Sequence, residues 1–204
     1  MRLRSLAIQL SKLERLPNQK SVLEQYQTDG EIAARWLFDI LAFNDLFEGC
    51  RVFDLGAGNG ILGIGAALLG AKSVSLVEVD DDACSICSKN IQSLGIDDKI
   101  SVINLEINDG INALGFPDLI ISNPPWGRQK MGADRPFLES IISFGANAHM
   151  MHSAEAKHIE TFFSEHGWSS EKYASFDFAI PASYKHHTRQ RSLTKASLWR
   201  ITPP

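Results

Sequence analysis

A rigid polar turn near the middle of the chain is suited to chemistry on a nitrogen atom. Residues 118–127 read DLIISNPPWG, so an apolar run ends at Asn123 and is followed directly by Pro124, Pro125 and Trp126. Either proline alone would end a strand, because proline has a fixed φ and no N–H to donate. The Asn123 side-chain oxygen and the Pro124 carbonyl are two acceptors that would stabilise charge developing on a planar amino group. The ring of Trp126 offers a face on which a base can stack.

A glycine-rich turn, DLGAGNG at residues 54–60, is typical of a cofactor site. Gly56, Gly58 and Gly60 allow a sharp turn that brings the backbone close to a ligand, and the following helix offers free N–H groups. Glu78 ends the next apolar run, at the position where an acidic side chain accepts hydrogen bonds from ribose hydroxyls. The turn and this carboxylate together predict a cofactor that contains adenosine.

Two kinds of cofactor fit this loop. Residues 58–63, GNGILG, match the G-x-G-x-x-G of dinucleotide-binding enzymes, but a single match of this kind is weakly specific. Asp54 lies two residues before the first glycine, as in enzymes that use S-adenosylmethionine, where it orders the loop near the methionine moiety. With that cofactor the methyl group is already electrophilic, so catalysis requires a nucleophile held in line about 3 Å away. A glycine turn that binds no ligand is the third interpretation.

The composition is that of an ordinary globular protein. The chain has 204 residues, of which 44% are hydrophobic and 22% are charged, which suffices for one domain with a full core. No apolar stretch approaches the roughly 18 to 20 residues that span a bilayer, and the N-terminus lacks the apolar region of a signal peptide. We therefore predict a cytoplasmic protein without a membrane partner.

Cysteine and histidine spacings do not predict a metal centre. Cys84 and Cys87 form a C-x-x-C pair inside a predicted helix, and no second pair stands beside them at zinc spacing. His149, His152 and His158 are close in sequence, again without the spacing of a zinc site. We expect free thiols and structural histidines here, and no bound metal.

Alternating patterns predict an α/β fold. From residue 51 onward, apolar runs of strand length alternate with helical periodicity, which indicates parallel βαβ units in a doubly wound sheet. The runs are short and almost wholly apolar, as in strands covered on both faces. We predict strands over 51–55, 73–79, 100–106, 118–122, 168–178 and 193–201. We predict helices over 1–19, 30–47, 59–71, 80–95, 136–148 and 154–166.

Several motifs resemble a known family. In this order, DLGAGNG, VEVD and NPPWG resemble class I S-adenosylmethionine-dependent methyltransferases that modify planar amino groups. LEQYQT at 23–28, IAAR at 32–35 and IPASYKHH at 180–187 are similar, together with NPPWG, to the methyltransferase-like protein five family. The resemblance covers nearly the whole chain, and its LEQYQT and PASYK segments are the specific ones.

This resemblance implies a fold, an activity and partners. The fold would be a seven-stranded, mostly parallel sheet, in which residues 1–48 form an N-terminal helical segment beside the cofactor site and 49–204 form the methyltransferase domain. The activity would be methylation of adenine N6 in small-subunit ribosomal RNA. RNA would be the partner, with the target base unpaired or flipped out of its stack. A small zinc-binding activator protein, used by eukaryotic relatives, is a further candidate partner.

The glycine loop and the resemblance together assign roles to individual residues. The catalytic residues would be Asn123, Pro124, Pro125 and Trp126. The residues that bind S-adenosylmethionine would be Gln25, Thr28, Asp54, Gly56, Gly58, Asn59, Gly60, Ile61, Glu78, Glu106 and Ile107. The chain departs from the common family pattern by having Glu78 and Glu106 instead of aspartate, Gln27 instead of proline, and Trp126 instead of phenylalanine or tyrosine.

The end of the chain is basic although the net charge is −4. No acidic residue follows Asp177, whereas Lys185, Arg189 and Arg191 are among five lysines and arginines after it. We predict that these three bind RNA phosphates, which position a protein on RNA without reading its sequence. A solvated loop is the alternative.

Other functions share parts of this pattern. Guanine-N2 RNA methyltransferases and protein glutamine-N5 methyltransferases also use Asn-Pro-Pro-aromatic on an amino or amide nitrogen. The glutamine enzymes would carry a larger helical domain before the glycine loop, where this chain has about fifty residues. An NAD-dependent oxidoreductase and a non-catalytic RNA-binding protein are the more distant alternatives.

Overall fold

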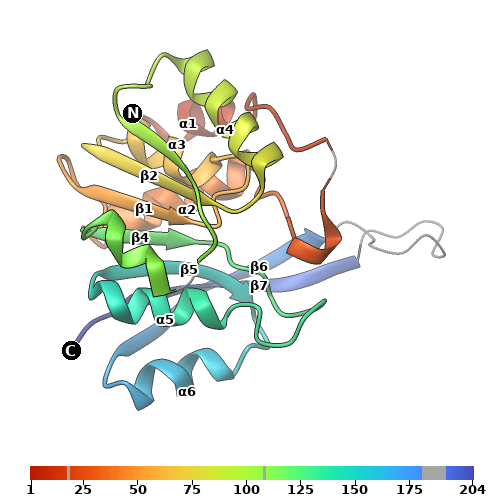
Figure 1. The fold of residues 1–204 in the computed structure, drawn as a ribbon, viewed down its shortest axis with the longest axis vertical. Helices are drawn as coiled ribbons and strands as arrows, with labels where there is room; N and C mark the ends of the chain where they lie inside the picture. Colours follow the sequence, from red (N-terminus) through yellow and green to blue (C-terminus); the bar gives the residue numbers. More distant parts are fainter. Residues whose placement is uncertain (18, 108, 181–191) are drawn as a thin grey trace.

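A seven-stranded sheet lies at the centre of the computed structural model, which describes residues 1–17, 19–107, 109–180 and 192–204 (Figure 1). Its strands are β1 (Arg51–Leu55), β2 (Ser73–Glu78), β3 (Ile100–Asn104), β4 (Leu119–Ser122), β5 (Asn147–Ser153), β6 (Ser169–Ile180) and β7 (Ser192–Thr202). Their order is β3-β2-β1-β4-β5-β7-β6. The first five strands pair in parallel, and β7 is antiparallel to β5 and β6. The predicted seven-stranded, mostly parallel α/β sheet is confirmed.

Helices cover both faces of this sheet (Figure 1). On one face lie α1 (Leu3–Leu10), α2 (Gly30–Ala42), α3 (Ile61–Leu68) and α4 (Asp81–Leu94), and on the other lie α5 (Arg135–Phe144) and α6 (His158–Glu165). Two short 3-10 helices, η1 (Ser21–Leu23) and η2 (Asp109–Leu114), lie in the connections. Successive side chains of β1 point to opposite faces, so Val52 joins the first core while Phe53 and Leu55 join the second. Both faces must therefore be apolar, as the sequence indicated.

The helix α3 approaches strand β2 at Gly63 and helix α2 at Gly65 closely, because these two residues lack a side chain. A Cβ on Gly63 would lie 2.2 Å from Leu76 Cδ2, and a Cβ on Gly65 would lie 2.3 Å from Leu37 Cδ1. The last glycine of GNGILG thus has a packing cause, since close helix–strand contact requires glycine at that position in this kind of loop.

The strand order places two loops side by side. β1 lies between β2 and β4, and the order reverses at β1 and β4. The glycine loop follows β1, and the Asn-Pro-Pro-Trp turn follows β4, so both leave the same edge of the sheet. In open α/β sheets this edge, at the reversal of strand order, is where ligands bind.

The helix predicted over residues 1–19 is wrong beyond Leu10, where α1 ends. The Glu14 N–H donates to Asn90 Oδ1 at 2.7 Å, and Asn90 Nδ2 donates to the Glu14 carbonyl at 3.1 Å. These two hydrogen bonds to α4 direct the chain away from the axis of α1. Similarly, the helix predicted to reach residue 47 ends at Ala42, and Asn44 adopts a positive φ of 59°.

The prediction over residues 136–148 missed a strand. α5 ends at Phe144, where Gly145 adopts φ 66° as a left-handed cap, and β5 begins at Asn147. The other predicted elements are present, with ends that differ by a few residues.

In the described ranges, no helix is long and apolar enough to cross a membrane. Lys185, Arg189 and Arg191 lie outside the described residues.

Candidate active site

A cavity of about 360 Å³ opens at the carboxyl ends of the strands. Four segments enclose it: the N-terminal residues 22–28, the glycine loop, the ends of β2 and β3, and the loops that follow β4. Its volume falls within the range of about 300 to 1,000 Å³ that small-molecule and cofactor sites occupy.

Most of the predicted site residues line this cavity. From the cofactor set these are Gln25, Thr28, Gly56, Gly58, Asn59, Ile61, Glu78, Glu106 and Ile107, and from the catalytic set Asn123 and Pro125. Asp54, Gly60, Pro124 and Trp126 are not among the lining residues. The side chains of Asp54 and Trp126 are buried behind the wall, where they can shape or hold the residues in front of them.

Glu78 ties the glycine loop to the end of β2. Its Oε2 accepts a hydrogen bond from Gly58 N at 2.8 Å, and its Oε1 accepts from Val79 N and Asp80 N, each at 3.0 Å. Burial raises the pKa of Glu78, although these backbone hydrogen bonds oppose the shift. The longer glutamate thus reaches back to the loop backbone while its side chain forms part of the cavity wall.

Asp54 supports the same loop from the interior. Its Oδ2 accepts from Gly63 N at 2.8 Å, in the first turn of α3, and the residue is 1% exposed. Burial raises the pKa of Asp54 to about 7, opposed by the Gly63 hydrogen bond and assisted by the charge of Glu78. Its contact is therefore with the start of α3, in keeping with a residue that orders the loop.

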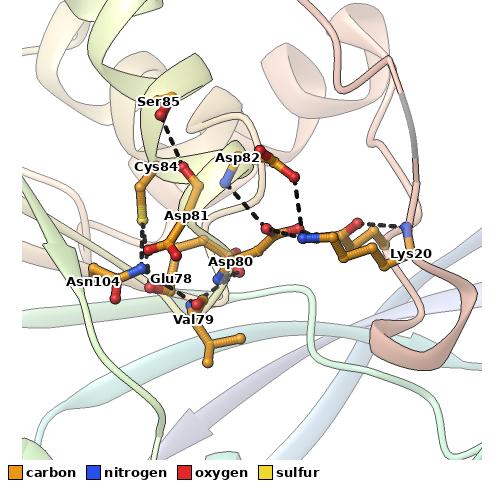
Figure 2. A network of polar contacts seen from close by, with 10 residues as sticks. Lys20, Glu78, Val79, Asp80, Asp81, Asp82, Cys84, Ser85 and Asn104 are labelled. Carbon is orange, nitrogen blue, oxygen red and sulfur yellow. Dashed lines mark hydrogen bonds and ion pairs between the residues drawn. The ribbon is translucent and has the colours of Figure 1, made fainter.

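The N-terminal residues 20–28, hereafter the strap, are fastened across this edge of the sheet. Lys20 Nζ lies 2.5 Å from Asp80 Oδ1 and 3.1 Å from Asp82 Oδ2 (Figure 2). Gln25 Nε2 donates to Asp80 Oδ2 at 2.6 Å, and Asp80 also caps α4 by accepting from Asp82 N. Asp80 is fully buried as a side chain, so its carboxylate needs these partners.

Asn123 lies at the cavity between the strap and the aromatic residue of its own turn. Its Oδ1 accepts from Trp126 Nε1 at 3.3 Å, and its Nδ2 donates to Thr28 Oγ1 at 3.4 Å. Because an indole nitrogen can only donate, this contact requires the carboxamide oxygen to face Trp126. The side chain is therefore oriented before any ligand arrives, on the same side of the sheet as the glycine loop.

Trp126 is a buried anchor in this structure, with 7% of its surface exposed. Its ring stacks on His152, with centroids 5.9 Å apart at 24°, and contacts Phe178 at 5.5 Å and Tyr26 at 6.2 Å. The Arg128 guanidinium lies 5.8 Å from the ring centroid. A base could stack on this ring only after one of these neighbours moved.

Behind Trp126, three polar residues form a cluster that resembles a metal site. The ligand atoms of Asp134, His152 and His158 lie within 4.8 Å of one another. However, His152 Nδ1 accepts the Ser153 N–H at 2.9 Å, so a neutral His152 carries its proton on Nε2, which faces Asp134. A metal ligand needs a bare nitrogen there and a donor on the other side of the ring. We therefore assign the cluster to the support of Trp126.

Three residues of this site were missed by the sequence analysis. Glu24 reaches the turn after β4, Asp80 holds the strap, and Asn90 holds Glu14 and also donates to the Asn59 carbonyl at 3.0 Å. LEQYQT and VEVD contain the first two, so the motifs marked the segments without indicating these contacts. Asn90 lies in an ordinary helix pattern and gave no signal.

Comparisons with known proteins identify the family of this chain. A family model described as Conserved hypothetical protein 95 matches residues 30–172. The rRNA N(6)-adenosine-methyltransferase METTL5 of Danio rerio is 30% identical over 207 residues, covering 100% of this chain and 100% of that protein. The chain belongs to the Conserved hypothetical protein 95 family and to the methyltransferase-like protein 5 family.

Two further similar proteins extend over nearly the whole of this chain. A Methanocaldococcus jannaschii protein described as uncharacterized is 33% identical over 205 residues, covering 96% of this chain and 92% of that one. A solved structure from Pyrococcus horikoshii, described as a "putative RNA methyltransferase", has a TM-score of 0.89 at 34% identity, covering 100% of this chain and 98% of that one. The predicted class I methyltransferase fold and the predicted family are confirmed.

Proposed function

We propose that this protein is an S-adenosylmethionine-dependent methyltransferase that acts on the exocyclic N6 of an adenine in RNA, with small-subunit ribosomal RNA as its substrate. The supporting observation is that Asn123 lines the same cavity as the glycine loop and Glu78. An acceptor for an amino group and a site for an adenosine-containing cofactor therefore open on one space. The full-length similarity to a relative named as an rRNA adenosine methyltransferase favours adenine.

The residues around the cavity fit this cofactor. Glu78 and Glu106 offer carboxylates for ribose and adenine, and the strap adds Gln25 and Thr28 to the lining of the cavity. When bound, S-adenosylmethionine supplies a methyl group on a positively charged sulfur. The protein's part is to place the target nitrogen in line with that methyl and to exclude water from the cavity.

Asn123 and Pro124 would supply the acceptors for the target amino group. Asn123 Oδ1 keeps a lone pair after accepting from Trp126, and the Thr28 contact limits rotation of the carboxamide. A fixed acceptor needs no reorganisation when charge develops on the nitrogen, which is the main source of such electrostatic catalysis. No side chain has to change its protonation state before the methyl moves, and the proton that the methylated nitrogen then loses would pass to solvent.

Several parts of this proposal remain predictions. Base stacking on Trp126 requires the ring to be uncovered first. Phosphate binding by Lys185, Arg189 and Arg191, a small zinc-binding activator partner and a cytoplasmic location rest on the sequence and its resemblance. Guanine N2 and a protein glutamine are the alternative acceptors of the methyl group, because the same two oxygens would suit them.

Replacement of Asn123 tests the proposed chemistry. We expect Asn123→Ala to lower the methylation rate by about 100-fold or more, as for loss of one electrostatic contact to a transition state. The affinity for S-adenosylhomocysteine should change little, because the proposal assigns Asn123 to the target amino group and not to the cofactor. Wild-type protein incubated with labelled cofactor and total RNA, followed by nucleoside analysis, should yield N6-methyladenosine.

Asn112→Ala is the matched control, since Asn112 bonds to Ser143 away from the cavity. Turnover by Asn123→Ala equal to that of this control would contradict the acceptor role. A methylated guanosine instead of N6-methyladenosine would assign the enzyme to the guanine alternative, and label transferred to protein glutamine but not to RNA would assign it to the glutamine alternative. Tight binding of NADH would contradict the choice of cofactor.

A further inference from the structure

Glu24 joins the strap to the turn that carries Asn123. Its Oε2 accepts from the backbone N–H of Trp126 at 2.8 Å, and its Oε1 accepts from the backbone N–H of Gln129 at 2.7 Å. The residue is 5% exposed, and its donors lie more than one hundred positions along the chain. A buried carboxylate with both oxygens bonded to backbone donors holds its partners firmly, because breaking either bond would leave a buried polar group unpaired.

The backbone at Glu24 is also unusual. It adopts φ 49° and ψ 42°, in the left-handed region that residues other than glycine and asparagine seldom occupy. Such a conformation persists only where the surroundings enforce it, and it is common at functional sites. Here it ends η1 and turns the glutamate toward the Asn-Pro-Pro-Trp turn, and Glu24 and its neighbours Leu23 and Gln25 all line the cavity.

The two backbone N–H groups that donate to Glu24 belong to the Asn-Pro-Pro-Trp turn and the residues directly after it. Pro124 and Pro125 have no N–H, so Trp126 is the first donor after Asn123. The same Trp126 uses its indole N–H to orient Asn123 Oδ1. A continuous series of contacts therefore leads from the Glu24 carboxylate, through the backbone and ring of Trp126, to the carboxamide that faces the cavity.

We propose that Glu24 is a positioning residue for methyl transfer, which fixes the turn after β4 against the strap and so sets where the Asn123 oxygen lies. This inference rests on the proposed function. Gln25 and Thr28, which are assigned to the cofactor, follow Glu24 on the strap. The Glu24 carboxylate therefore aligns these two residues with the Asn123 side-chain oxygen. Loss of Glu24 displaces the acceptor while the other contacts of the cofactor wall remain, including Gln25 with Asp80 and Glu78 with the glycine loop.

Kinetics of two variants test this role. Glu24→Gln keeps the size but directs an NH2 group at one of the two N–H donors, and Glu24→Ala removes both bonds. We expect kcat to fall by about 10- to 100-fold in both, since small displacements of a reacting group have effects of this order. The dissociation constant of S-adenosylhomocysteine should stay within about threefold of wild type. The control is Glu31→Gln, an exposed glutamate paired with Arg35 one turn along α2.

A second measurement does not depend on the substrate. In 15N-labelled protein, the amides of Trp126 and Gln129 should exchange with solvent much faster in both Glu24 variants than in wild type. The Gly63 amide is an internal reference, because it donates to another buried carboxylate, that of Asp54. Its exchange should be unchanged.

The outcomes separate this inference from the proposed function. Wild-type kcat in Glu24→Gln and Glu24→Ala, or unchanged exchange at Trp126 and Gln129, would overturn the positioning role while the enzyme assignment stands. An equal loss of cofactor affinity and kcat would also overturn it, by showing that Glu24 merely holds the fold. If wild-type protein methylated no RNA, the proposed function would fail, and the exchange measurement would still decide whether Glu24 holds the turn.

Discussion

The carboxyl of Asp54 is buried near the end of β1, and its Oδ1 has no hydrogen-bond partner among the described residues. Its other oxygen is bonded to the start of α3. Burial destabilises the charged carboxylate by more free energy than the one backbone hydrogen bond from Gly63 stabilises it. The pKa of Asp54 therefore rises to about 7. The group that orders the glycine loop therefore weakens the fold when it ionises.

This shift predicts a pH dependence of stability. The unfolded carboxyl loses its proton near pH 3.8 and the folded one near pH 7, so Asp54 favours folding most below pH 4. Its contribution falls as the pH rises from about 4 to 7. Over this window the free energy of unfolding of Asp54→Asn should rise relative to that of wild type by at most about 4 kcal/mol, from a shift of about three pKa units at about 1.4 kcal/mol each. Urea denaturation at pH 4.5, 6 and 7.5 measures this difference.

The control for this experiment is Asp97→Asn, at an exposed position. It should show the wild-type dependence on pH. If the difference in free energy of unfolding between Asp54→Asn and wild type were the same at all three pH values, Asp54 would already be ionised at pH 4.5.

Trp126 shows how a single residue can add a contact at a site that a family shares. The resemblance leads us to expect phenylalanine or tyrosine at this position, and a phenylalanine has no group to donate. Here the indole N–H reaches Asn123 Oδ1 at 3.3 Å. This tryptophan thus gives the Asn123 side-chain oxygen a fixed direction, and its ring packs against His152 and Phe178.

At the scale of elements, the strap completes the cavity. It is a short segment with one 3-10 turn, so its position depends on polar contacts: Lys20 and Gln25 with Asp80, Glu24 with the turn after β4, and Thr28 with Asn123. Figure 2 shows the first of these, with Lys20 directed at Asp80 and Asp82. The strap thereby links α4 at one end to β4 at the other.

Lys20→Met tests the first of these attachments. Lys20 remains half exposed, so the pair is partly screened, and we expect a roughly two- to fivefold weaker affinity for S-adenosylhomocysteine. Higher salt should reduce the difference in affinity between Lys20→Met and wild type, because exposed charges are screened. Titration calorimetry at low and high salt measures both effects.

Lys12→Met is the control for the strap, since Lys12 lies outside it and is exposed. Its affinity should equal that of wild type. Equal affinities of Lys20→Met and Lys12→Met at low salt would show that the strap stays in place without this ion pair.

At the scale of the whole molecule, a buried charge network joins parts of the chain that are far apart. Asp45, which follows α2, accepts from His149 Nε2 at 2.9 Å and from Arg200 Nε at 2.6 Å, and also from Asn147. Burial would raise the pKa of Asp45, but hydrogen bonds from His149 and Arg200 outweigh it and hold the pKa below its usual value. The loop after α2 is thus fastened to β5 and β7.

Removal of this carboxylate should destabilise the fold. We expect Asp45→Ala to lower the free energy of unfolding by about 3 kcal/mol near pH 7, because it leaves buried partners uncompensated. The loss should shrink as the pH falls below about 4, since a carboxylate with a lowered pKa contributes above its unfolded pKa and less below it. Guanidinium denaturation at pH 3 and pH 7 measures this.

The matched variant is Asp118→Ala, which breaks a partly exposed pair with Arg51. Its loss of stability should be smaller, since screened pairs contribute little. Similar losses in the two variants would show that burial of the Asp45 network adds nothing.

The strand that the sequence analysis missed shows why such networks are hard to predict. β1 and β4 were predicted because their runs are apolar on both faces. β5 contains Asn147, His149 and His152, and it is nonetheless almost entirely buried. Each polar side chain has its partner elsewhere, Asp45 for the first two and Asp134 for the third. Because these partners lie far away in the sequence, the polar residues at 147, 149 and 152 do not indicate a buried strand.

The amino-acid sequence alone determined the fold class, the glycine loop, the acidic residue after it and the turn that bears Asn123. These features depend on local periodicity, on the geometry of glycine and proline, and on the order of elements along the chain. Each of these can be recognised in a short stretch of sequence. Only the tertiary structure decided that Glu24 holds that turn, that Trp126 is buried behind the cavity, and that α1 ends where Asn90 captures the chain. These contacts join residues up to about a hundred positions apart, and their free energy exists only once the sheet has brought both partners together.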